Sequence, residues 1–446
     1  MSEWSLPDGW RSQSLGEIAD VVFSNVDKKT VAGEKPVLLC NYMDVYSNEY
    51  ITHKLNFMEA TASAAEIARF SVQEGDVIAT KDSETPEDIG VPAVVVEDIP
   101  NLVCGYHLTQ IKPHRDIVNP VFLSKQIAHD RIARYFSRLA NGSTRYGLST
   151  SSFDEMPVWL PGLSRQCKIA RILTTLDELI EYTESLIAKY QVIKQGLMHD
   201  LFTRGVDEDG HLRSNYEDAP ELYKESELGW IPKEWEVSRL GRFLDAIGGY
   251  LQTGPFGSQL HAYEYVSDGV AVIMPQDINE GVVGFASIAR VTEEKAATMA
   301  RHRVQANDIV FSRRGDLSRA AAITNTEAGA ICGTGCFLLR APSDGLNSQW
   351  LATIYSHEFV QKQVEARAVG STMPSLNNAV MAGLQIAFPE VEEQAAIVHC
   401  IANLDAIIRQ CGQHASKLRL QKTGLMQDLL TGVVTVKLDD EEADNG

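Results

Sequence analysis

Residues 194–206 read KQGLMHDLFTRGV, and residues 422–434 read KTGLMQDLLTGVV, 228 positions further along the chain. At the same offset, residues 161–206 align with residues 389–434 without a gap and share 15 identical residues in 46 positions. Self-similarity at a fixed period indicates an internal duplication. These stretches therefore decide how the rest of the chain is divided into repeats.

The duplication extends toward the amino terminus of each half. ANGSTRYGL (140–148) matches AVGSTMPSL (368–376) at the offset of 228, and LPDGW (6–10) matches IPKEW (231–235) at an offset of 225. Each half has the length of an ordinary domain. The sequence thus predicts a tandem repeat that covers almost the whole chain.

The composition is typical of a globular protein in a reducing compartment. Apolar residues make up 44% of the 446 residues, and we find no run long and apolar enough to span a bilayer. The amino terminus lacks a basic region followed by an apolar run, so we expect a cytoplasmic protein. Seven cysteines without a CxxC pair fit that compartment. Cys332 and Cys336 lack a second ligand pair, so we expect core residues and no metal site.

The formal charge of −20 argues against a general nucleic-acid coat protein, because such binding depends on neutralising phosphates. The acidic residues are concentrated, however, in residues 207–236 and in the tail DDEEADNG (439–446). Residues 290–319 carry seven basic and four acidic residues. Local basic patches therefore remain on the repeated halves.

Both copies of the repeat predict a long amphipathic helix, because apolar residues alternate steps of four and three as in a coiled-coil seam. Lys194 and Lys422 occupy the same step of the two seams. Two seams of equal length and register most simply pack against each other as an antiparallel pair, although each helix could instead pack only on its own domain. The predicted seam residues are Ile169, Leu173, Leu176, Ile180, Ile187, Leu197 and Leu201 in the first copy, and Ile397, Ile401, Leu404, Ile408, Leu418, Leu425 and Leu429 in the second.

Strand-like stretches such as VPAVVVE (91–97) and CFLLRAP (336–342) precede each long helix, and a further helix is expected to begin at Asn119 and at Asn347. We therefore predict a mixed α/β (α+β) fold with two tandem domains separated by two long helices, which form an intramolecular antiparallel coiled coil with pseudo-two-fold symmetry. The predicted segments are the first domain (1–160), the central long helix (161–206), an acidic linker (207–228), the second domain (229–388), the distal long helix (389–434) and an acidic tail (435–446).

A pseudo-two-fold protein suits a ligand that is itself two-fold, and duplex DNA is the obvious candidate because dyads lie perpendicular to its axis. Antiparallel helices would relate the two domains by a pseudo-dyad and fix their separation. Because the halves differ outside the shared motifs, they would read different bases. The expected ligand is double-stranded DNA with a bipartite, asymmetric site.

Several motifs recur along nearly all of the chain. They are LPDGW and IPKEW at the start of each half, GPFGSQL (254–260) with MPQDI (274–278), NDIVFSRRGDLSRAA (307–321), the two GST turns, and the two GLM helix ends. In these motifs and in their order, the sequence resembles the specificity subunits of type I restriction–modification systems. In the first half, KDSETPEDIG (81–90) replaces the arginine-rich turn, so its base-reading loop cannot be carried over.

The resemblance implies a DNA-recognition subunit with two target-recognition domains and no catalytic site of its own. It implies a phage-defence complex in which two modification subunits methylate adenine and restriction subunits translocate and cleave DNA. S-adenosylmethionine, ATP and Mg would then bind to these partners, and no cofactor would bind to this chain. No membrane partner is implied.

Three arginines form the strongest candidate contact with DNA. Arg313, Arg314 and Arg319 follow a predicted strand, where guanidinium groups can pair with phosphates or with guanine edges. The alternative is surface ion pairing with Asp308 or Asp316.

Further candidates lie in turns with small polar residues, where side chains and backbone amides can approach phosphates. Helix capping and tight turns are the structural alternatives for these residues. The remaining predicted DNA-binding residues are Lys81, Ser143, Thr144, Arg145, Tyr146, Gly257, Ser258, Gln259, Ser371 and Thr372.

We find no catalytic motif in the sequence. A GxxxxGK[ST] loop for ATP and an NPPY-type or DPPY-type tetrapeptide for adenine are both absent, and CGTGCF (332–337) has no glycine-rich counterpart in the first half. The chemistry is therefore expected from partners. Two alternatives remain, namely a self-contained DNA methyltransferase or nuclease with an unrecognised motif, and a scaffold that binds only protein.

Overall fold

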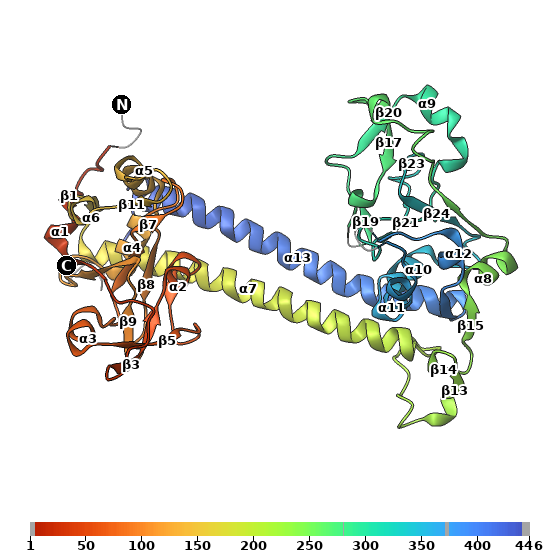
Figure 1. Cartoon of the computed structure of the whole chain (residues 1–446), viewed down its shortest axis with the longest axis horizontal. Helices are drawn as coiled ribbons and strands as arrows, with labels where there is room; N and C mark the ends of the chain where they lie inside the picture. The colour runs from red at the N-terminus through yellow and green to blue at the C-terminus, as the bar shows by residue number, and fades with distance from the viewer. Residues whose placement is uncertain (1–4, 280, 371–373, 439–446) are drawn as a thin grey trace. The chain divides into compact units, whose positions relative to one another are not determined.

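The computed structural model describes residues 5–279, 281–370 and 374–438. The chain divides into two compact units, of which unit 1 comprises residues 1–185 and 412–446, and unit 2 comprises residues 186–411. Each unit contains one mixed α/β domain and parts of two long helices, α7 (Leu163–Thr203) and α13 (Val391–Leu430) (Figure 1). The division between the units falls inside both helices.

Unit 1 is built on two sheets. The five-stranded sheet has the order β2 (Ala19–Phe23), β10 (Leu108–Pro113), β6 (Val77–Thr80), β8 (Pro92–Val95) and β4 (Tyr50–Ile51). The three-stranded sheet has the order β5 (Met58–Ala62), β3 (Lys35–Cys40) and β9 (Leu102–Cys104). Short pairs join β1 (Arg11–Ser14) to β12 (Pro157–Leu160), and β7 (Asp82–Ser83) to β11 (Tyr146–Gly147). Central strands such as β6 and β8 are buried along their whole length, as expected for strands covered on both faces.

Short helices accompany these sheets, namely α1 (Leu15–Ile18), α2 (Tyr42–Tyr46), α3 (Ala64–Phe70), α4 (Pro120–Ala128), α5 (Asp130–Leu139) and α6 (Thr150–Asp154). The Asn119 side chain accepts a hydrogen bond from the backbone N–H of Phe122 and caps α4, as the sequence predicts. The predicted helix is in fact two, because His129 ends α4 and caps α5.

Unit 2 repeats this plan. One sheet has the order β16 (Tyr250–Thr253), β24 (Cys336–Arg340), β21 (Ile309–Ser312) and β22 (Ala320–Ala322), and the other has the order β20 (Ala289–Val291), β17 (Val270–Ile273) and β23 (Ile331–Cys332). β15 (Glu236–Arg239) pairs with β25 (Gln385–Phe388) as β1 pairs with β12. The helices are α8 (Leu240–Ile247), α9 (Glu293–Thr298), α10 (Ser348–Tyr355), α11 (Glu358–Arg367) and α12 (Asn378–Ala382). Asn347 caps α10, and His357 caps α11, so the helix split also recurs.

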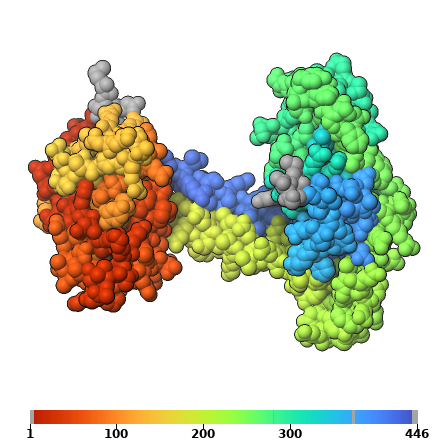
Figure 2. All heavy atoms as spheres, viewed as in Figure 1, coloured from red at the N-terminus to blue at the C-terminus, as the bar shows by residue number. Residues whose placement is uncertain are grey.

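The two long helices pair antiparallel within each unit. In unit 1, Nζ of Lys422 on α13 lies 2.6 Å from Oδ1 of Asp177 on α7. In unit 2, Nζ of Lys194 on α7 lies 2.6 Å from Oδ1 of Asp405 on α13. The two helices lie in contact in each unit (Figure 2). None of the fourteen predicted seam residues is exposed, so the predicted pairing is confirmed.

Each long helix also contributes to a domain core at both of its ends. Ile169 and Leu173, near the start of α7, belong to the core of the first domain, and Leu201, near its end, belongs to the core of the second. For α13, Ile397 lies in the core of the second domain and Leu429 in that of the first. Packing of a helix on its own domain therefore accompanies helix pairing and does not replace it.

The repeated helix ends have a common structural role. α7 and α13 are each followed by a glycine with a left-handed backbone, Gly205 at φ +64° and Gly432 at φ +70°. A Cβ atom would lie 2.6 Å from the Trp235 ring at Gly205 and 3.1 Å from the Trp10 ring at Gly432. Each helix end thus closes on the tryptophan of the IPKEW or LPDGW motif, which explains why these motifs recur together.

The segment predicted as an acidic linker is partly folded. β13 (Tyr223–Ser226) pairs with β14 (Gly229–Pro232), so the predicted boundary at residue 229 falls inside a hairpin. Arg213 forms an ion pair with Glu393 of α13, which also accepts a hydrogen bond from Nε1 of Trp235 at 3.0 Å. In the described part of the chain, we find no helix long and apolar enough to cross a membrane.

Candidate nucleic-acid interface

In unit 2, the candidate residues gather at one edge of the four-stranded sheet. β24 lies between β16 and β21 and is antiparallel to both, with Thr253 opposite Phe337 and Ser312 opposite Cys336. The segments that follow β16 and β21 therefore leave the sheet at the same edge. The backbone N–H of Arg313 donates to Gly335 O at 2.7 Å, which holds this turn against the segment before β24.

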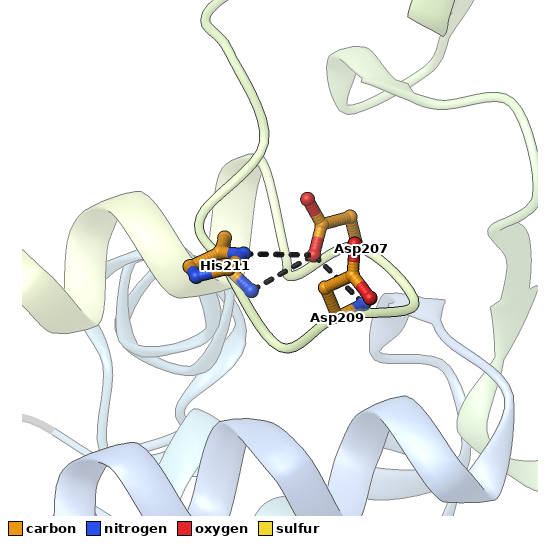
Figure 3. Close-up of side chains that lie close together, drawn as sticks. All are labelled: Asp207, Asp209 and His211. Carbon is orange, nitrogen blue, oxygen red and sulfur yellow. Dashed lines mark hydrogen bonds and ion pairs between the residues drawn. The ribbon is translucent and has the colours of Figure 1, made fainter.

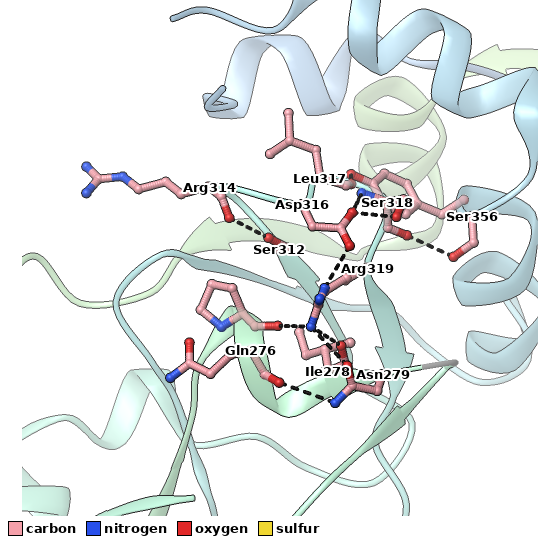
Figure 4. Close-up of polar contacts among 12 residues, drawn as sticks. Gln276, Ile278, Asn279, Ser312, Arg314, Asp316, Leu317, Ser318, Arg319 and Ser356 are labelled. Carbon is pink, nitrogen blue, oxygen red and sulfur yellow. Dashed lines mark hydrogen bonds and ion pairs between the residues drawn. The ribbon is translucent and has the colours of Figure 1, made fainter. Parts of the chain in front are cut away.

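The guanidinium of Arg319 is engaged within the protein (Figure 4). Its Nε lies 2.9 Å from Oδ2 of Asp316, and its Nη1 donates to the carbonyl oxygens of Ile278 at 3.1 Å and Pro275 at 3.4 Å. The alternative of an ion pair with Asp316 is therefore the observed arrangement. Asp308 pairs instead with Arg340, at 2.6 Å between Oδ2 and Nη2.

The side chains of Arg313 and Arg314 differ in burial and in hydrogen bonding. Arg313 is half-buried, its Nε donates to Leu376 O at 3.2 Å, and burial together with the neighbouring Arg314 lowers its pKa. Arg314 is exposed, and its backbone forms a bridge with Ser375. Within the described part of the chain, we find no hydrogen bond or ion pair of its guanidinium, which extends away from the Arg319 network in Figure 4.

The glycine-rich turn after β16 is exposed and forms its own hydrogen bonds. Gly257, Ser258 and Gln259 are exposed beside the exposed ring of Phe256. Oε1 of Gln259 accepts from the backbone N–H of Phe256 at 3.1 Å, so this side chain closes the turn. The backbone N–H of Gly254 donates to Cys336 O at 2.8 Å, which places the turn beside the Arg313 segment.

In unit 1, Lys81 occupies the position of Arg313. Thr80 lies opposite Leu108, as Ser312 lies opposite Cys336, so Lys81 follows the equivalent strand end. Its ammonium lies 3.1 Å from Oδ2 of Asp82 and 5.8 Å from the centre of the Tyr106 ring. The same Asp82 oxygen lies 2.8 Å from Nδ1 of His107. Burial opposes ionisation of Asp82, but the hydrogen bonds with His107 and Lys81 hold its pKa below the ordinary value.

The GST turn of unit 1 lies beside Lys81. Tyr146 pairs with Ser83 and Gly147 with Asp82, which brings this turn against the segment after β6. Ser143, Thr144 and Arg145 are exposed, whereas Tyr146 is half-buried. In unit 2, Val369 and Arg314 both bridge to Ser375 in the equivalent arrangement. Ser371 and Thr372, predicted as contacts, lie outside the described residues.

Sequence reasoning missed several residues at this edge of unit 1. The rings of Tyr42 and Tyr46 stack at 5.5 Å between centroids, and Tyr42 lies near both Ser83 and Arg145. Lys28 and Lys29, both exposed, lie in the segment after β2, which corresponds to the glycine-rich turn of unit 2. The dipeptide of lysines was one available signal. Tyr42 and Tyr46 lie four residues apart on α2, so the helix itself stacks their rings, but only tertiary packing brings Tyr42 near Ser83 and Arg145.

The helix pair carries apolar side chains outside the seam. In unit 1, Leu179 of α7 and Leu420 of α13 are 44% and 75% exposed. In unit 2, Ile407 of α13 and Val192 of α7, which occupy the same repeat positions, are 39% and 68% exposed. Leu179 lies two residues after Asp177 and Leu420 two residues before Lys422, so the two side chains lie at one level of the antiparallel pair. Each unit thus presents an equivalent exposed apolar set.

We assign no metal site. In the part of the chain that the structure describes, one group of three potential ligands comes together, Asp207, Asp209 and His211, with ligand atoms within 4.8 Å of one another (Figure 3). All three are exposed, and Oδ1 of Asp207 accepts the backbone N–H groups of Asp209 at 3.1 Å and His211 at 2.8 Å. These bonds account for the turn. Cys332 and Cys336 are fully buried core residues, as predicted, and burial raises the pKa of both thiols.

Known proteins share both the sequence pattern and the fold. The sequence matches the type I restriction modification DNA specificity domain over residues 7–191 and again over residues 232–415. In Methanocaldococcus jannaschii, the putative type I restriction enzyme MjaX specificity subunit is 22% identical over 97% of this chain and 95% of that protein. The type I restriction enzyme MjaVIII specificity subunit of the same organism is 25% identical, and the alignment spans 64% of each chain.

The fold is similar to that of the S subunit of a type I restriction–modification system from M. genitalium, with a TM-score of 0.55 and 15% identity over 96% of this chain and 97% of that one. A chain from a structural study of complex assembly and conformational transition in the type I R-M system also gives a TM-score of 0.55, with 16% identity over 97% of this chain and 100% of that one. At these identities the similarity concerns the fold.

Proposed function

This chain belongs to the family of type I restriction modification DNA specificity domains, and from that premise we propose that it reads a bipartite, asymmetric sequence in double-stranded DNA. As a specificity subunit, it selects the sequence on which the other subunits of the complex act. Each unit contacts one half-site through the turns at the edge of its main sheet.

One observation carries this proposal. The two units place equivalent turns after equivalent strands, but the side chains in these turns differ. The turn of unit 2 carries Arg313 and Arg314, and that of unit 1 carries Lys81 and Asp82. Bases are distinguished by donors and acceptors at groove edges, so different side chains on one framework read different bases. Basic residues at these edges also supply the phosphate contacts that orient a protein on DNA, although the whole chain is acidic.

We further propose that two modification subunits bind this chain, one to each unit. The equivalent exposed apolar sets, Leu179 with Leu420 and Ile407 with Val192, support two copies of one partner. The chemistry then belongs to the partners, with S-adenosylmethionine for adenine methylation on the modification subunits and ATP and Mg for the restriction subunits.

Methylation mapping tests the function directly. The chain is expressed with its modification subunits in a host that lacks other methyltransferases, and modified adenines are located in the genome. We expect two short defined sequences separated by a fixed number of unspecified base pairs. A single uninterrupted site, or modification without sequence preference, would contradict the proposal.

Two controls separate the alternatives. The purified chain alone, supplied with S-adenosylmethionine, ATP and Mg, is expected to neither methylate nor cleave DNA, whereas turnover would indicate a self-contained enzyme. Selection of genomic fragments by the complete complex is expected to enrich the mapped sequence. A complex that assembles but enriches no sequence would indicate a scaffold that binds only protein.

A further inference from the structure

Comparison of equivalent positions in the two units helps to identify the side chains that read bases. Such a side chain must be exposed, must lack a hydrogen-bonding partner in its own chain, and must belong to a turn that hydrogen bonds hold in place. Where two units read different half-sites, the residue must also differ between equivalent positions. Among the described residues of unit 2, Arg314 and Gln276 meet these conditions.

Arg314 is the first. Its backbone bridges to Ser375 as that of Asp82 bridges to Gly147, so positions 314 and 82 are equivalent. Asp82 is held by Lys81 and His107, whereas the exposed guanidinium of Arg314 has no partner among the described residues.

Gln276 is the second, and the sequence reasoning did not single it out. It lies between Met274 and Asp277, where the backbone N–H of Met274 donates to Oδ2 of Asp277 at 2.8 Å. The backbone N–H of Asn41 donates to Oδ2 of Asp44 at 2.7 Å in the same way, so Gln276 corresponds to Met43 of unit 1. Gln276 is exposed, and within the described residues its side-chain amide has no hydrogen bond.

One residue braces both turns. Arg319 joins Asp316, in the turn that carries Arg314, to the carbonyl oxygens of Pro275 and Ile278, on either side of Gln276. In Figure 4, the side chains of Arg314 and Gln276 both extend away from this network. Arg319 therefore acts as a positioning residue, and the two free side chains stand on one connected framework.

We propose that Arg314 and Gln276 are the base-reading side chains of unit 2, and that its half-site contains a guanine read by Arg314 and an adenine read by Gln276. A guanidinium can donate two hydrogen bonds to O6 and N7 of guanine, and an amide can pair with N6 and N7 of adenine. The equivalent residues of unit 1, Asp82 and Met43, cannot make these pairs, so the other half-site has a different sequence. This inference rests on the function proposed above.

The test uses the chain in complex with its modification subunits and a DNA library randomised at both half-sites. Arg314→Ala and Gln276→Ala are compared with wild type and with a matched control, Arg242→Ala, which removes an exposed arginine on α8. Discrimination is measured as the ratio of affinities for the preferred base and each other base at every position. Because the ratio compares DNA sequences bound by one protein preparation, partial inactivity does not change it.

We expect Arg314→Ala to reduce the preference for one guanine by about five- to a hundredfold, and Gln276→Ala to do the same for one adenine. All positions of the other half-site keep their preference, and Arg242→Ala matches wild type. Uniform weakening at every sequence, with a shallower salt dependence, would identify phosphate contacts and overturn the inference. Loss at a base other than guanine or adenine would also overturn it. If wild type itself selects no bipartite sequence, the proposed function fails first.

Discussion

Lys422 of α13 and Asp177 of α7 form an ion pair with 2.6 Å between Nζ and Oδ1, and the repeat supplies its counterpart, Lys194 with Asp405, at the same distance. In each unit, the aspartate of one helix copy therefore meets the lysine of the other copy. The surroundings differ, because Asp177 also contacts Lys125, whose side chain is 3% exposed, whereas the side chains of Lys194 and Asp405 are 29% and 31% exposed. One pair is thus part of a buried network, and the other lies near solvent.

This difference predicts unequal stability effects at equivalent positions. Asp177→Ala leaves the buried Lys125 and the half-buried Lys422 with only Glu49 as counter-ion and is expected to destabilise unit 1 by about 3–5 kcal/mol. Asp405→Ala, the matched control, should cost about 1 kcal/mol or less. Urea denaturation of the purified chain measures both. Equal losses would show that burial by the first domain does not strengthen the network.

The same network predicts a pH dependence. Burial raises the pKa of Asp177, but Lys125, Lys422 and Tyr50 outweigh it and hold the pKa below the ordinary value. A carboxyl whose pKa is lowered on folding stabilises the fold above its unfolded pKa of about 4, and this contribution is lost as the pH falls through the folded pKa. The stability advantage of wild type over Asp177→Asn should therefore be full at pH 7 and shrink below about pH 4. An advantage independent of pH would exclude ionisation as its origin.

The exposed apolar side chains of the helix pair predict which substitutions weaken the binding of modification subunits. Leu179→Asp combined with Leu420→Asp should keep the stability of the chain, because both side chains are exposed, yet weaken binding of one modification subunit. Native mass spectrometry should then show one copy, where the proposed function gives two for wild type. Leu176→Asp, three residues before Leu179 but in the seam, should instead destabilise the chain by several kcal/mol. Retention of both copies by the double variant would exclude this surface as the binding site.

Helix length predicts the spacing of the half-sites. The variant carries an insertion of seven residues, one heptad, in each long helix. The insertion lies between Thr183 and Lys194 in α7 and between Cys411 and Lys422 in α13. It keeps the seam in phase and both ion pairs available. It adds about 10 Å, or about three base pairs at 3.4 Å each. Methylation mapping should show a longer spacer with unchanged half-sites. The same insertion in α7 alone is the control and should impair folding, because one helix then lacks its partner register.

The features that could be predicted from the sequence are those set by local pattern. The seam alternation exists in the residue order itself, and each predicted seam residue is buried or half-buried. Asn119 and Asn347 cap helices because a short polar side chain reaches a backbone amide three residues away. The repeat also located the candidate turns, since equal offsets imply equal folds. The split of one predicted helix at His129 was missed, because a capping histidine within a helical run has no distinctive pattern.

Only the tertiary structure decided which candidate side chains remain free. Three arginines within seven residues are equivalent in the sequence, yet Arg319 is bound to carbonyl groups about forty residues away while Arg314 is left exposed. Gln276 and Tyr42 follow strands of the three-stranded sheets, and only long-range packing brings them beside the turns of the other sheet. The sequence by itself thus determined the duplication, the helix pair and the position of the turns, because these follow from spacing along the chain. The availability of each charge depends on partners brought together by long-range packing, which residue order does not specify.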